Sequence, residues 1–277
     1  MGPAEPGTLH VVATPIGNLG DLSDRARAVL GAVDAICAED TRHTRQLLTA
    51  CGIDRPLLAL HEHNEAEIAW QLVERLKAGQ SLALVSDAGT PLVSDPGYRL
   101  VREVRAAGLA VRPVPGACAA IAALSVAGIP SDRFCFEGFL PARGAARRER
   151  LTGLAREGRT LVFYESSHRI EESLADMADV FGPEREAVLA RELTKLYETV
   201  FGDTLGAILA RVQADDQQRR GEFVLVVRGA EDDGTAALRE GQRLYARLKE
   251  LLSPSQAAKL AAELSGAPRK SLYGGEA

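Results

Sequence analysis

Two acidic residues and an arginine follow an apolar segment early in the chain. Glu39 and Asp40 come directly after residues 32–38, a predicted strand, and Arg42 lies two positions further on. Carboxylates at a strand end can hold ribose hydroxyls or act as a general base, and an arginine there can face a phosphate. The same residues can instead be the charged first turn of a helix that Asp40 or Thr41 caps. The sequence leaves both interpretations open.

A loop of small residues follows another predicted strand. Residues 84–97, LVSDAGTPLVSDPG, run from an apolar strand into Ser, Asp, Ala, Gly, Thr and Pro. Such short side chains leave main-chain N–H and C=O groups open to a ligand, and α/β proteins bind ligands at the carboxyl ends of their strands. We therefore expect a binding edge here. Asp87 and Asp95 could hydrogen-bond a polar ligand or simply form Asx turns.

Two other strand ends carry weaker signals. Residues 14–23 keep only Gly17 and Gly20 of a dinucleotide-binding fingerprint, so this loop can be a plain turn into a helix capped by Ser23. His61 and His63 could share a metal, because residues two apart in a strand face the same way. No further ligands stand at a suitable spacing, so polar lining or RNA contact is favoured and no metal is expected.

Arginines are concentrated in residues 139–159. The six are Arg143, Arg147, Arg148, Arg150, Arg156 and Arg159. A charge run is usually a solvated helix face, but planar guanidinium groups suit phosphates. We therefore expect local nucleic-acid contact, although the net charge of -5 argues against a wholly basic nucleic-acid-binding protein.

Two polar clusters end strands in the second half of the chain, YESSHR from Tyr164 and RELTK from Arg191. Their ionisable side chains are those of Glu165, His168, Arg169, Arg191, Glu192 and Lys195. Ordinary surface charge explains one such cluster at a sheet edge more easily than two.

The elements that must position these residues alternate in the first half. Strands are expected near residues 9–14, 32–38, 57–60, 81–86 and 110–114. Helices are expected near residues 23–30, 41–50, 65–77 and 97–107, followed by Gly31, Gly52, Gly79 and Gly108 as C-caps. The alternation predicts an α/β fold with a mainly parallel, helix-covered sheet.

The second half is less regular. A small-residue helix ends at Gly128, and a further helix is expected near residues 204–212. Strands are expected near residues 134–138, 160–164, 186–191, 198–201 and 223–227. This spacing favours a mixed sheet. After an acidic linker, helices near residues 236–252 and 256–264 form a small appendage.

The chain is thus predicted to hold two α/β domains, residues 8–116 and 117–230, and a helical appendage, residues 236–277. Its 46% hydrophobic and 26% charged residues are typical of globular proteins. Four cysteines without a CxxC pair indicate free thiols in a reducing compartment. With no signal peptide and no segment of membrane-spanning length, we expect a cytoplasmic protein without membrane contact.

Seven motifs together are more specific than any one of them. They are LHVVATPIGNLGDLS, AEDTRHTRQLL, LHEHNE, LVSDAGTPLVSDPGYRLV, FEGFLP, LVFYESSHRI and ARELTKLYE. In this order and spacing they resemble the bacterial family of small-subunit rRNA 2'-O-methyltransferases, part of the tetrapyrrole methylase superfamily. The resemblance covers about residues 9–229, and the appendage also resembles that family's C-terminal extension.

The resemblance implies two α/β domains with S-adenosyl-L-methionine between them, a homodimer, and methylation of a cytidine ribose in the decoding centre of 16S rRNA in the 30S subunit. It assigns to the methyl donor, mainly through the main chain, Pro15, Gly17, Asp87, Ala88, Gly89, Thr90, Pro91, Gly116, Ala117 and Cys118, with the strands around Arg191 and Phe223 completing an adenine pocket. RNA contact is expected from Arg42, Arg143, Arg147, Arg148 and Arg169. Ala117-Cys118 departs from the family's usual Pro-Ser, which weakens a hydroxyl contact there, and Ser167 stands where a Pro is usual.

The expected reaction is an in-line displacement by a ribose hydroxyl, a poor nucleophile until its proton leaves. We predict that Glu192 or Lys195 assists at this hydroxyl and that Arg191 or Arg169 holds the adjacent phosphate. Lys195 could act as a base only with a lowered pKa. The alternatives are a methylase of tetrapyrroles or other small metabolites, which leaves the arginine run and the appendage unexplained, and a non-catalytic ribosome-binding factor.

Overall fold

The computed structural model describes residues 4–61, 63–231 and 235–272 of the chain. Glu62 of the histidine motif, residues 232–234 of the predicted linker and residues 273–277 of the predicted appendage lie outside the described residues. The chain divides into two units, residues 1–228 and residues 229–277. Each unit has a hydrophobic core of its own.

The first sheet is entirely parallel. From edge to edge its strands are β3 (Leu57–Ala59), β2 (Ala35–Ala38), β4 (Leu82–Val85), β1 (Thr8–Val12) and β5 (Ala110–Val114). In β2 and β4 every residue is buried, as expected for strands covered on both faces. The mainly parallel sheet predicted for the first half is confirmed.

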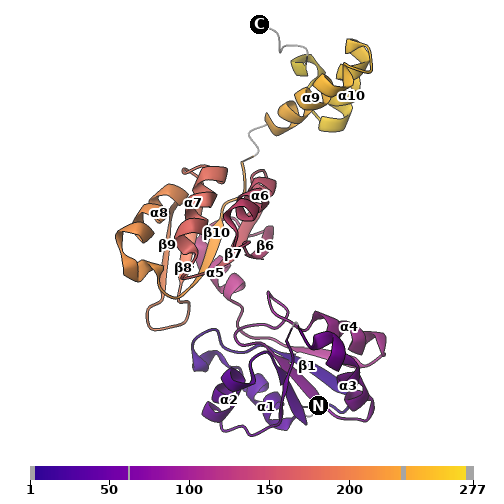
Figure 1. The fold of residues 1–277 in the computed structure, drawn as a ribbon, viewed down its shortest axis with the longest axis vertical. Helices are drawn as coiled ribbons and strands as arrows, with labels where there is room; N and C mark the ends of the chain where they lie inside the picture. The colour runs from indigo at the N-terminus through magenta and orange to yellow at the C-terminus, as the bar shows by residue number, and fades with distance from the viewer. Residues whose placement is uncertain (1–3, 62, 232–234, 273–277) are drawn as a thin grey trace. The chain divides into compact units, whose positions relative to one another are not determined.

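Helices cover both faces of this sheet (Figure 1). They are α1 (Asp24–Ala32), α2 (Thr41–Ala50), α3 (Glu65–Lys77) and α4 (Tyr98–Ala106). Successive strand residues point to opposite faces, so Leu82 and Leu84 pack against α3 and α4, whereas Ala83 and Val85 pack against α1 and α2. We call this sheet with its four helices the first lobe.

The second sheet is mixed, as predicted. Its order is β6 (Phe134–Phe139), β7 (Thr160–Ser166), β10 (Glu222–Val227), β8 (Glu186–Arg191) and β9 (Thr199–Thr204), and only the pairing of β6 with β7 is parallel. One face packs on α5 (Ala119–Ala127). The other face packs on α6 (Gly144–Leu154), α7 (Ile170–Phe181) and α8 (Leu205–Ala214). We call this sheet with its helices the second lobe.

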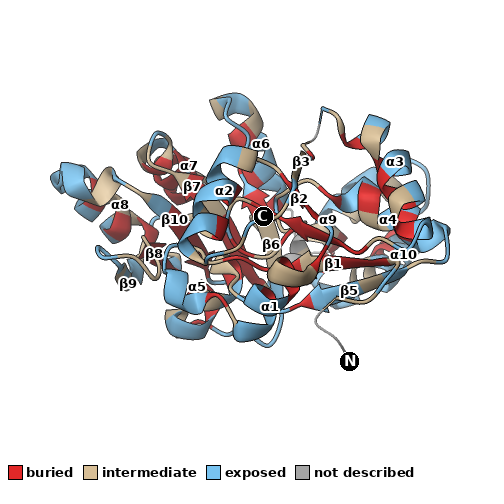
Figure 2. Cartoon of the chain, turned by 90° about the horizontal axis from the view of Figure 1, so that it is seen from below, coloured by how far each residue is buried: buried red, intermediate tan, exposed pale blue. Residues whose placement is uncertain are grey.

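Figure 2 shows the central strands of both sheets as buried and the outer faces of the helices as exposed. The edge strands β3, β5, β6 and β9 are largely half-buried or exposed. The predicted domain boundary after residue 116 falls between β5 and α5. Because both lobes belong to one unit, that boundary stays a prediction.

The second unit consists of α9 (Thr235–Leu248), α10 (Pro254–Ser265) and a final 3-10 turn, Arg269–Leu272. Pro254 stands in the first turn of α10, where its missing N–H costs nothing, and Gly266 ends the helix in the left-handed conformation with φ 74°. Ala261, Ala267 and Leu272 form its small core.

The structure corrects the sequence prediction in two places. Gly31 does not end the first helix: α1 continues to Ala32, and the following strand begins only at Ala35. The helix α7 was not predicted, although its apolar residues recur at helical spacing after the charged motif. Its buried residues include Leu174, Met177 and Phe181.

An ion-pair network joins α6 to α7 and explains part of the arginine run. The Arg147 side chain is 4% exposed, and its Nε donates to Asp176 at 2.5 Å while a terminal nitrogen donates to Glu172 at 3.1 Å. Arg148 reaches the second oxygen of Asp176 at 3.0 Å. A buried charge needs such partners, so Arg147 holds two helices together instead of facing solvent.

Removing the carboxylate tests this structural role. Asp176→Ala would leave the buried Arg147 without its nearest partner, so we expect the free energy of unfolding to fall by about 3–5 kcal/mol. Asp179→Ala, on the exposed side of the same helix, is the matched control and should change it by less than about 0.5 kcal/mol. Urea unfolding followed by circular dichroism measures both, and equal stabilities for the two variants would contradict the assignment.

Candidate functional site

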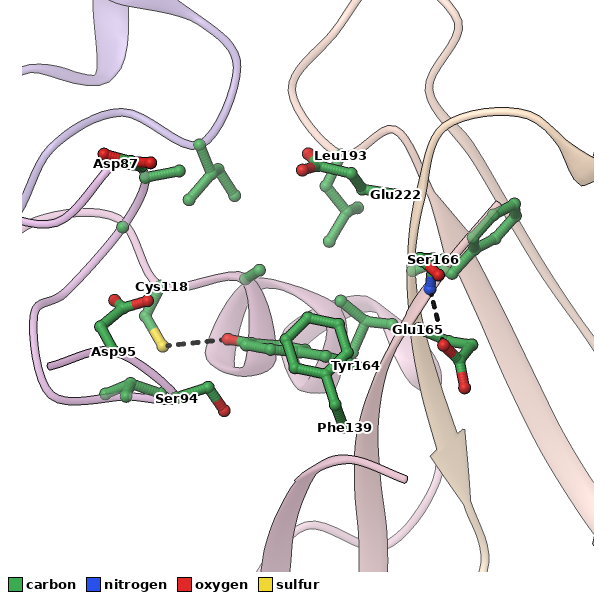
Figure 3. Close-up of a pocket in the computed structure, with 18 of the residues that line it drawn as sticks. Asp87, Ser94, Asp95, Cys118, Phe139, Tyr164, Glu165, Ser166, Leu193 and Glu222 are labelled. Atoms are coloured by element: carbon green, nitrogen blue, oxygen red, sulfur yellow. Dashed lines mark hydrogen bonds between the residues drawn. The ribbon is translucent and has the colours of Figure 1, made fainter. Parts of the chain in front are cut away.

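A cleft of about 500 Å³ lies between the strand ends of the two lobes (Figure 3). On the first-lobe side it is lined by Ile16, Glu39, Asp87, Ala88, Gly89, Thr90, Val93, Ser94 and Asp95. The start of α5 and the second lobe contribute Cys118, Ala119, Phe139, Tyr164, Glu165, Ser166, Ser167, Ala190, Leu193, Lys195, Gly221, Glu222, Phe223 and Val224. The residues come from both halves of the chain, which meet only in the folded protein.

Main-chain hydrogen bonds join the loops of the first wall. The loops after β1 and β4 pair as a short antiparallel bridge, in which Thr14 N donates to Gly89 O at 2.8 Å and Gly89 N donates to Thr14 O at 3.1 Å. The Thr90 hydroxyl donates to the Ala117 carbonyl after β5 at 2.9 Å. The Asp40 N–H, after β2, donates to Asp87 at 3.0 Å. Four strand ends thus form one continuous wall.

Three carboxylates face the cleft from this wall, those of Glu39, Asp87 and Asp95. Burial is the main cause that raises the pKa of Asp95 to about 6, with the negative charges of Glu39 and Asp87 adding to it and a hydrogen bond with Ser86 opposing it. In Figure 3, Asp87 and Asp95 lie on the same side of the cleft. The wall therefore favours a positively charged ligand group.

The sequence left open whether Glu39 and Asp40 belong to a site or to the first turn of a helix, and the structure separates their roles. The Asp40 carboxylate accepts hydrogen bonds from the N–H groups of Arg42 and His43, so Asp40 is the N-cap of α2. Its neighbour Glu39 lies in the cleft. One acid of the doublet is structural, and the other faces the site.

Aromatic side chains form the floor between the two walls. Tyr164 stacks edge to face on Phe136 and Phe139, with ring centroids 4.9 and 5.7 Å away. Its hydroxyl accepts from the Ala120 N–H at 3.1 Å at the start of α5 and lies 4.0 Å from the Cys118 sulfur. Burial is the main cause that raises the pKa of Tyr164, so the phenol stays protonated.

A lysine between two carboxylates stands on the second wall, where Lys195 and Glu222 line the cleft and Glu192 is not among the lining residues. Lys195 Nζ lies 2.8 Å from Glu192 Oε1 and 2.8 Å from Glu222 Oε2. Partial burial opposes the charge of Lys195, but these hydrogen bonds outweigh it and raise the pKa of the ammonium. Burial also opposes the charge of Glu192, while its bonds to Lys195 and to the Glu222 N–H outweigh it and lower the pKa of that carboxyl. Lys195 is therefore an ammonium and not a base in this state.

Strained backbone marks both walls. Among the described non-glycine residues, those with positive φ are Leu92 (73°), Ser94 (67°), Glu192 (50°) and Thr194 (68°). Two lie in the loop after β4 and two in the loop after β8. Such conformations cost about 1–3 kcal/mol each and are typical of functional sites.

The structure brings half of the residues predicted for the methyl donor directly to the cleft: Asp87, Ala88, Gly89, Thr90 and Cys118. The others do not belong to its lining. Pro91 is buried behind the wall, Ala117 accepts the hydrogen bond from Thr90, Pro15 is half-buried in the first loop, and a Cβ on Gly116 would come within 2.9 Å of the Ala13 Cβ.

Gly17 has a contact that its sequence context did not suggest. A Cβ at this position would lie 2.4 Å from Lys195 Cγ and 3.1 Å from Thr194 Oγ1. The loop after β1 therefore touches the loop after β8 across the end of the cleft. Glycine is needed here because the Lys195 stem occupies the space of a side chain.

The predicted phosphate-binding arginines are mostly engaged within the chain. Arg191 is 8% exposed and donates to the carbonyls of Arg220 at 2.7 Å and Tyr197 at 3.2 Å. Arg169 donates to Leu140 O at 2.9 Å and pairs with the buried Glu165 at 2.8 Å. These bonds fix loops beside the cleft.

The other predicted RNA contacts differ in exposure. Arg147 is enclosed by the α6–α7 network, which speaks against direct phosphate contact. Arg42 and Arg148 keep 89% and 55% of their side chains exposed although each has an ion-pair partner. Arg143 is exposed at the N-terminus of α6.

The sequence left Asp95 open between a ligand contact and an Asx turn, and it did not assign to the site several other lining residues, among them Phe139, Tyr164 and Glu222. Asp95 and Tyr164 belong to motifs that were noticed, but their orientation toward one cleft depends on pairings between distant strands. Glu222 begins β10, opposite Ser166 in the antiparallel register, and nothing in its local sequence marks it.

The described part of the histidine motif consists of His61, His63 and Asn64. The rings of His61 and His63 lie 6.0 Å apart, and no group of three or more His, Cys, Asp or Glu side chains in the described residues could hold a metal ion. Among the helices that the structure describes, none is long and apolar enough to cross a membrane.

The acidic wall predicts a pH dependence. The pKa of Asp95 in the folded protein lies near 6, above its ordinary 3.8, so ionising Asp95 destabilises the fold. Asp95→Asn cannot ionise, and the wild type should therefore lose stability relative to this variant as the pH rises from about 4 to about 6, with no further divergence above about 7. Urea unfolding across this range measures the difference. Asp21→Asn, an exposed site, is the control; a pH-independent difference for Asp95→Asn would contradict the buried-carboxylate assignment.

Comparison with known proteins places the chain in a family. Residues 8–209 match the model described as Tetrapyrrole (Corrin/Porphyrin) Methylases, and residues 235–274 match the RsmI C-terminal HTH domain. Among solved structures, a uroporphyrin-III-C-methyltransferase from Thermus thermophilus shares the fold with a TM-score of 0.54 and 20% identity, over 80% of this chain and 94% of that one.

Curated relatives cover nearly the whole chain. A ribosomal RNA small subunit methyltransferase I from Xylella fastidiosa (strain Temecula1) is 65% identical over 98% of this chain and 99% of its own length. The protein of that name from Escherichia coli O157:H7 is 53% identical over 96% of this chain and 93% of its own. With both its first unit and its C-terminal helices matched, this chain belongs to the ribosomal RNA small subunit methyltransferase I family of the tetrapyrrole methylases.

Proposed function

We propose that the chain transfers a methyl group from S-adenosylmethionine to the ribose 2'-hydroxyl of a cytidine in the decoding centre of 16S rRNA. The observation that carries this proposal is the similarity, over nearly the full length, to proteins named ribosomal RNA small subunit methyltransferase I. The match of residues 235–274 to the C-terminal domain of that family adds support. A methylase of small metabolites would leave this second unit without a role.

The cleft fits such a donor in size and charge. Its volume of about 500 Å³ lies within the range of ordinary small-molecule sites. When bound, S-adenosylmethionine would supply a methyl group on a positively charged sulfur. Asp87 and Asp95 would attract that charge, and Ile16, Val93 and Leu193 would contact apolar parts of the molecule.

The second wall would act on the ribose hydroxyl. Lys195, held as an ammonium, would stabilise the negative charge that develops on the 2'-oxygen as its proton leaves. That oxygen would then form the new C–O bond to the methyl carbon while the C–S bond breaks and its electron pair stays on sulfur. The adjacent Glu192 carboxylate would accept the hydroxyl proton. The sequence predicted that either Glu192 or Lys195 assists at the 2'-hydroxyl. In this proposal both residues take part, Glu192 as the proton acceptor and Lys195 as the stabilising charge.

Arg191 would be a positioning residue. Its guanidinium binds the Tyr197 carbonyl, which joins the end of the loop that carries Glu192 and Lys195 to its start, and it binds the Arg220 carbonyl, which joins this loop to the segment before β10. The phosphate contact expected of Arg191 or Arg169 would fall instead to exposed arginines, Arg42, Arg143 and Arg148.

The remaining expectations are part of the same proposal. A substrate in the 30S subunit implies action in the cytoplasm. We also propose a homodimer, as expected for this family, for which the exposed Ile121 and Val126 on α5 offer an apolar surface.

A labelled-donor assay separates the candidate functions. Purified protein, radiolabelled S-adenosylmethionine and 30S subunits that lack the modification should give labelled 16S rRNA, with the methyl group on a cytidine ribose after nuclease digestion. Labelling of a porphyrin precursor in place of rRNA would favour the small-metabolite enzyme. Donor binding and 30S binding without methyl transfer would favour a non-catalytic factor.

Substitutions in the second wall test the division of roles. Lys195→Ala should lower kcat about 10²–10³-fold by removing the charge beside the 2'-oxygen, and Lys195→Arg should recover part of it. Glu192→Gln should lower kcat by at least about 10²-fold. Single-turnover methylation of 30S subunits measures these rates, with donor affinity measured by calorimetry and expected to stay within about three-fold.

Glu184→Ala is the matched control, because Glu184 is exposed outside the cleft. It should methylate at the wild-type rate. A wild-type kcat for Lys195→Ala would exclude Lys195 from the reaction, and a loss of donor affinity without a change in kcat would move it to donor binding.

A further inference from the structure

A second groove lies outside the cleft, between α3 and α4 of the first lobe. Its volume is about 680 Å³, and its larger side chains are those of Trp70, Glu74, Lys77, Arg99, Arg102 and Glu103. The methyl-transfer reaction proposed above uses none of these residues. The groove therefore needs an explanation of its own.

One exposed aromatic ring, Trp70, lines this groove, and a second, Tyr98, precedes its lining residue Arg99 in the chain. Trp70, the single tryptophan of the chain, is 63% exposed on α3, and Tyr98 is 64% exposed at the start of α4. The Arg102 guanidinium lies 5.8 Å from the centre of the Tyr98 ring. Exposed rings of this size, accompanied by arginine, are typical of surfaces on which nucleic-acid bases stack.

The charge of the groove favours an anionic partner. Lys77 pairs with Glu74 at 2.8 Å, and Arg102 pairs with Glu103 at 3.1 Å. Arg99 makes no hydrogen bond or ion pair that the described part of the chain accounts for, so it leaves one positive charge in excess. The apolar part of the lining other than Trp70 consists of small side chains, Ala66, Ala69, Val73, Ala106 and Ala107, whereas most of the large side chains are charged. This composition favours an anionic partner over an apolar protein surface or a second copy.

The groove begins at the same edge of the sheet as the cleft. Glu65 in the first turn of α3 accepts a hydrogen bond from the Leu100 N–H in the first turn of α4, at 2.9 Å. Residues 87–90 and 93–95 line the cleft, and the chain leads from them through Gly97 into Tyr98. A strand of RNA that enters the cleft is therefore within reach of this surface.

We propose that the α3–α4 groove is an RNA-contact surface, with a base stacked on Trp70 or Tyr98 and the adjoining phosphate held by Arg99 and Arg102. The proposal rests on the proposed function, because it takes the substrate to be rRNA. It adds a surface that would hold nucleotides flanking the target while the cleft holds the target itself.

The single tryptophan makes the test direct. Titrating the wild-type protein with 30S subunits is complicated by their own absorption, so the probe is a short single-stranded cytidine and uridine oligonucleotide. Stacking should quench the Trp70 fluorescence in a saturable way that weakens with added salt. Filter binding establishes the oligonucleotide concentration at which the protein is saturated. If the Trp70 fluorescence is not quenched at that concentration, the stacking role of Trp70 is overturned.

Variants extend the test to the natural substrate. Trp70→Ala, Tyr98→Ala and Arg99→Ala should each weaken 30S binding about five-fold or more, and Trp70→Phe should retain most of the affinity because a ring remains. Donor affinity and thermal unfolding should stay at wild-type values, which separates lost contact from lost folding. Arg211→Ala is the control, because Arg211 also lies over an aromatic ring, Phe201, at 3.9 Å but outside the groove.

The outcomes separate this proposal from the proposed function. If the wild type methylates 30S subunits and the groove variants bind them equally well, the groove proposal fails and the function stands. If no methylation occurs but the oligonucleotide still quenches Trp70, the function fails and the groove remains an RNA surface. If Trp70→Ala converts a dimer to a monomer in sedimentation, the groove binds a second copy and the RNA assignment is overturned.

Discussion

The antiparallel bridge between Thr14 and Gly89 is the interaction on which the cleft depends. Parallel strands bring their carboxyl ends to one edge, but they do not by themselves hold the loops that follow. Two main-chain hydrogen bonds join the loops after β1 and β4, and the Thr90–Ala117 bond extends the connection to α5 and the second lobe. Small side chains are needed throughout, because a larger residue at Gly89 would press on Ile16.

The two walls that this connection sets opposite each other carry different charges. The first presents carboxylates, among them Asp87 and Asp95 (Figure 3). The second presents the Lys195 ammonium between the carboxylates of Glu192 and Glu222. Neither arrangement is favourable in isolation, since burial raises the pKa of Asp95 and backbone strain accompanies Glu192 and Thr194. Costs of this kind, placed on both sides of one cleft, are typical of a site selected for chemistry.

Much of the fold could be predicted from the sequence because apolar periodicity and turn residues are local signals. The parallel and the mixed sheet, and the Pro254 start of α10, follow from such signals. The burial and the ion-pair partners of ionisable side chains do not follow from local signals. Arg147 and Arg143 look alike in the arginine run, yet only the packing of α6 on α7 encloses Arg147 with Asp176. Likewise, the sequence alone leaves Lys195 possible as a base. One hydrogen bond that keeps Lys195 protonated is donated to Glu222, 27 positions away, and only the folded chain brings the two side chains together.

The acidic wall has a consequence for turnover under the proposed reaction. Methyl transfer would convert the positively charged sulfonium of the donor into an uncharged thioether. The demethylated product therefore has no charge at sulfur. The field of Glu39, Asp87 and Asp95 would then hold it less strongly than it held the fresh molecule. The acidic wall that attracts the charged donor would therefore also favour release of the product once its sulfur is uncharged.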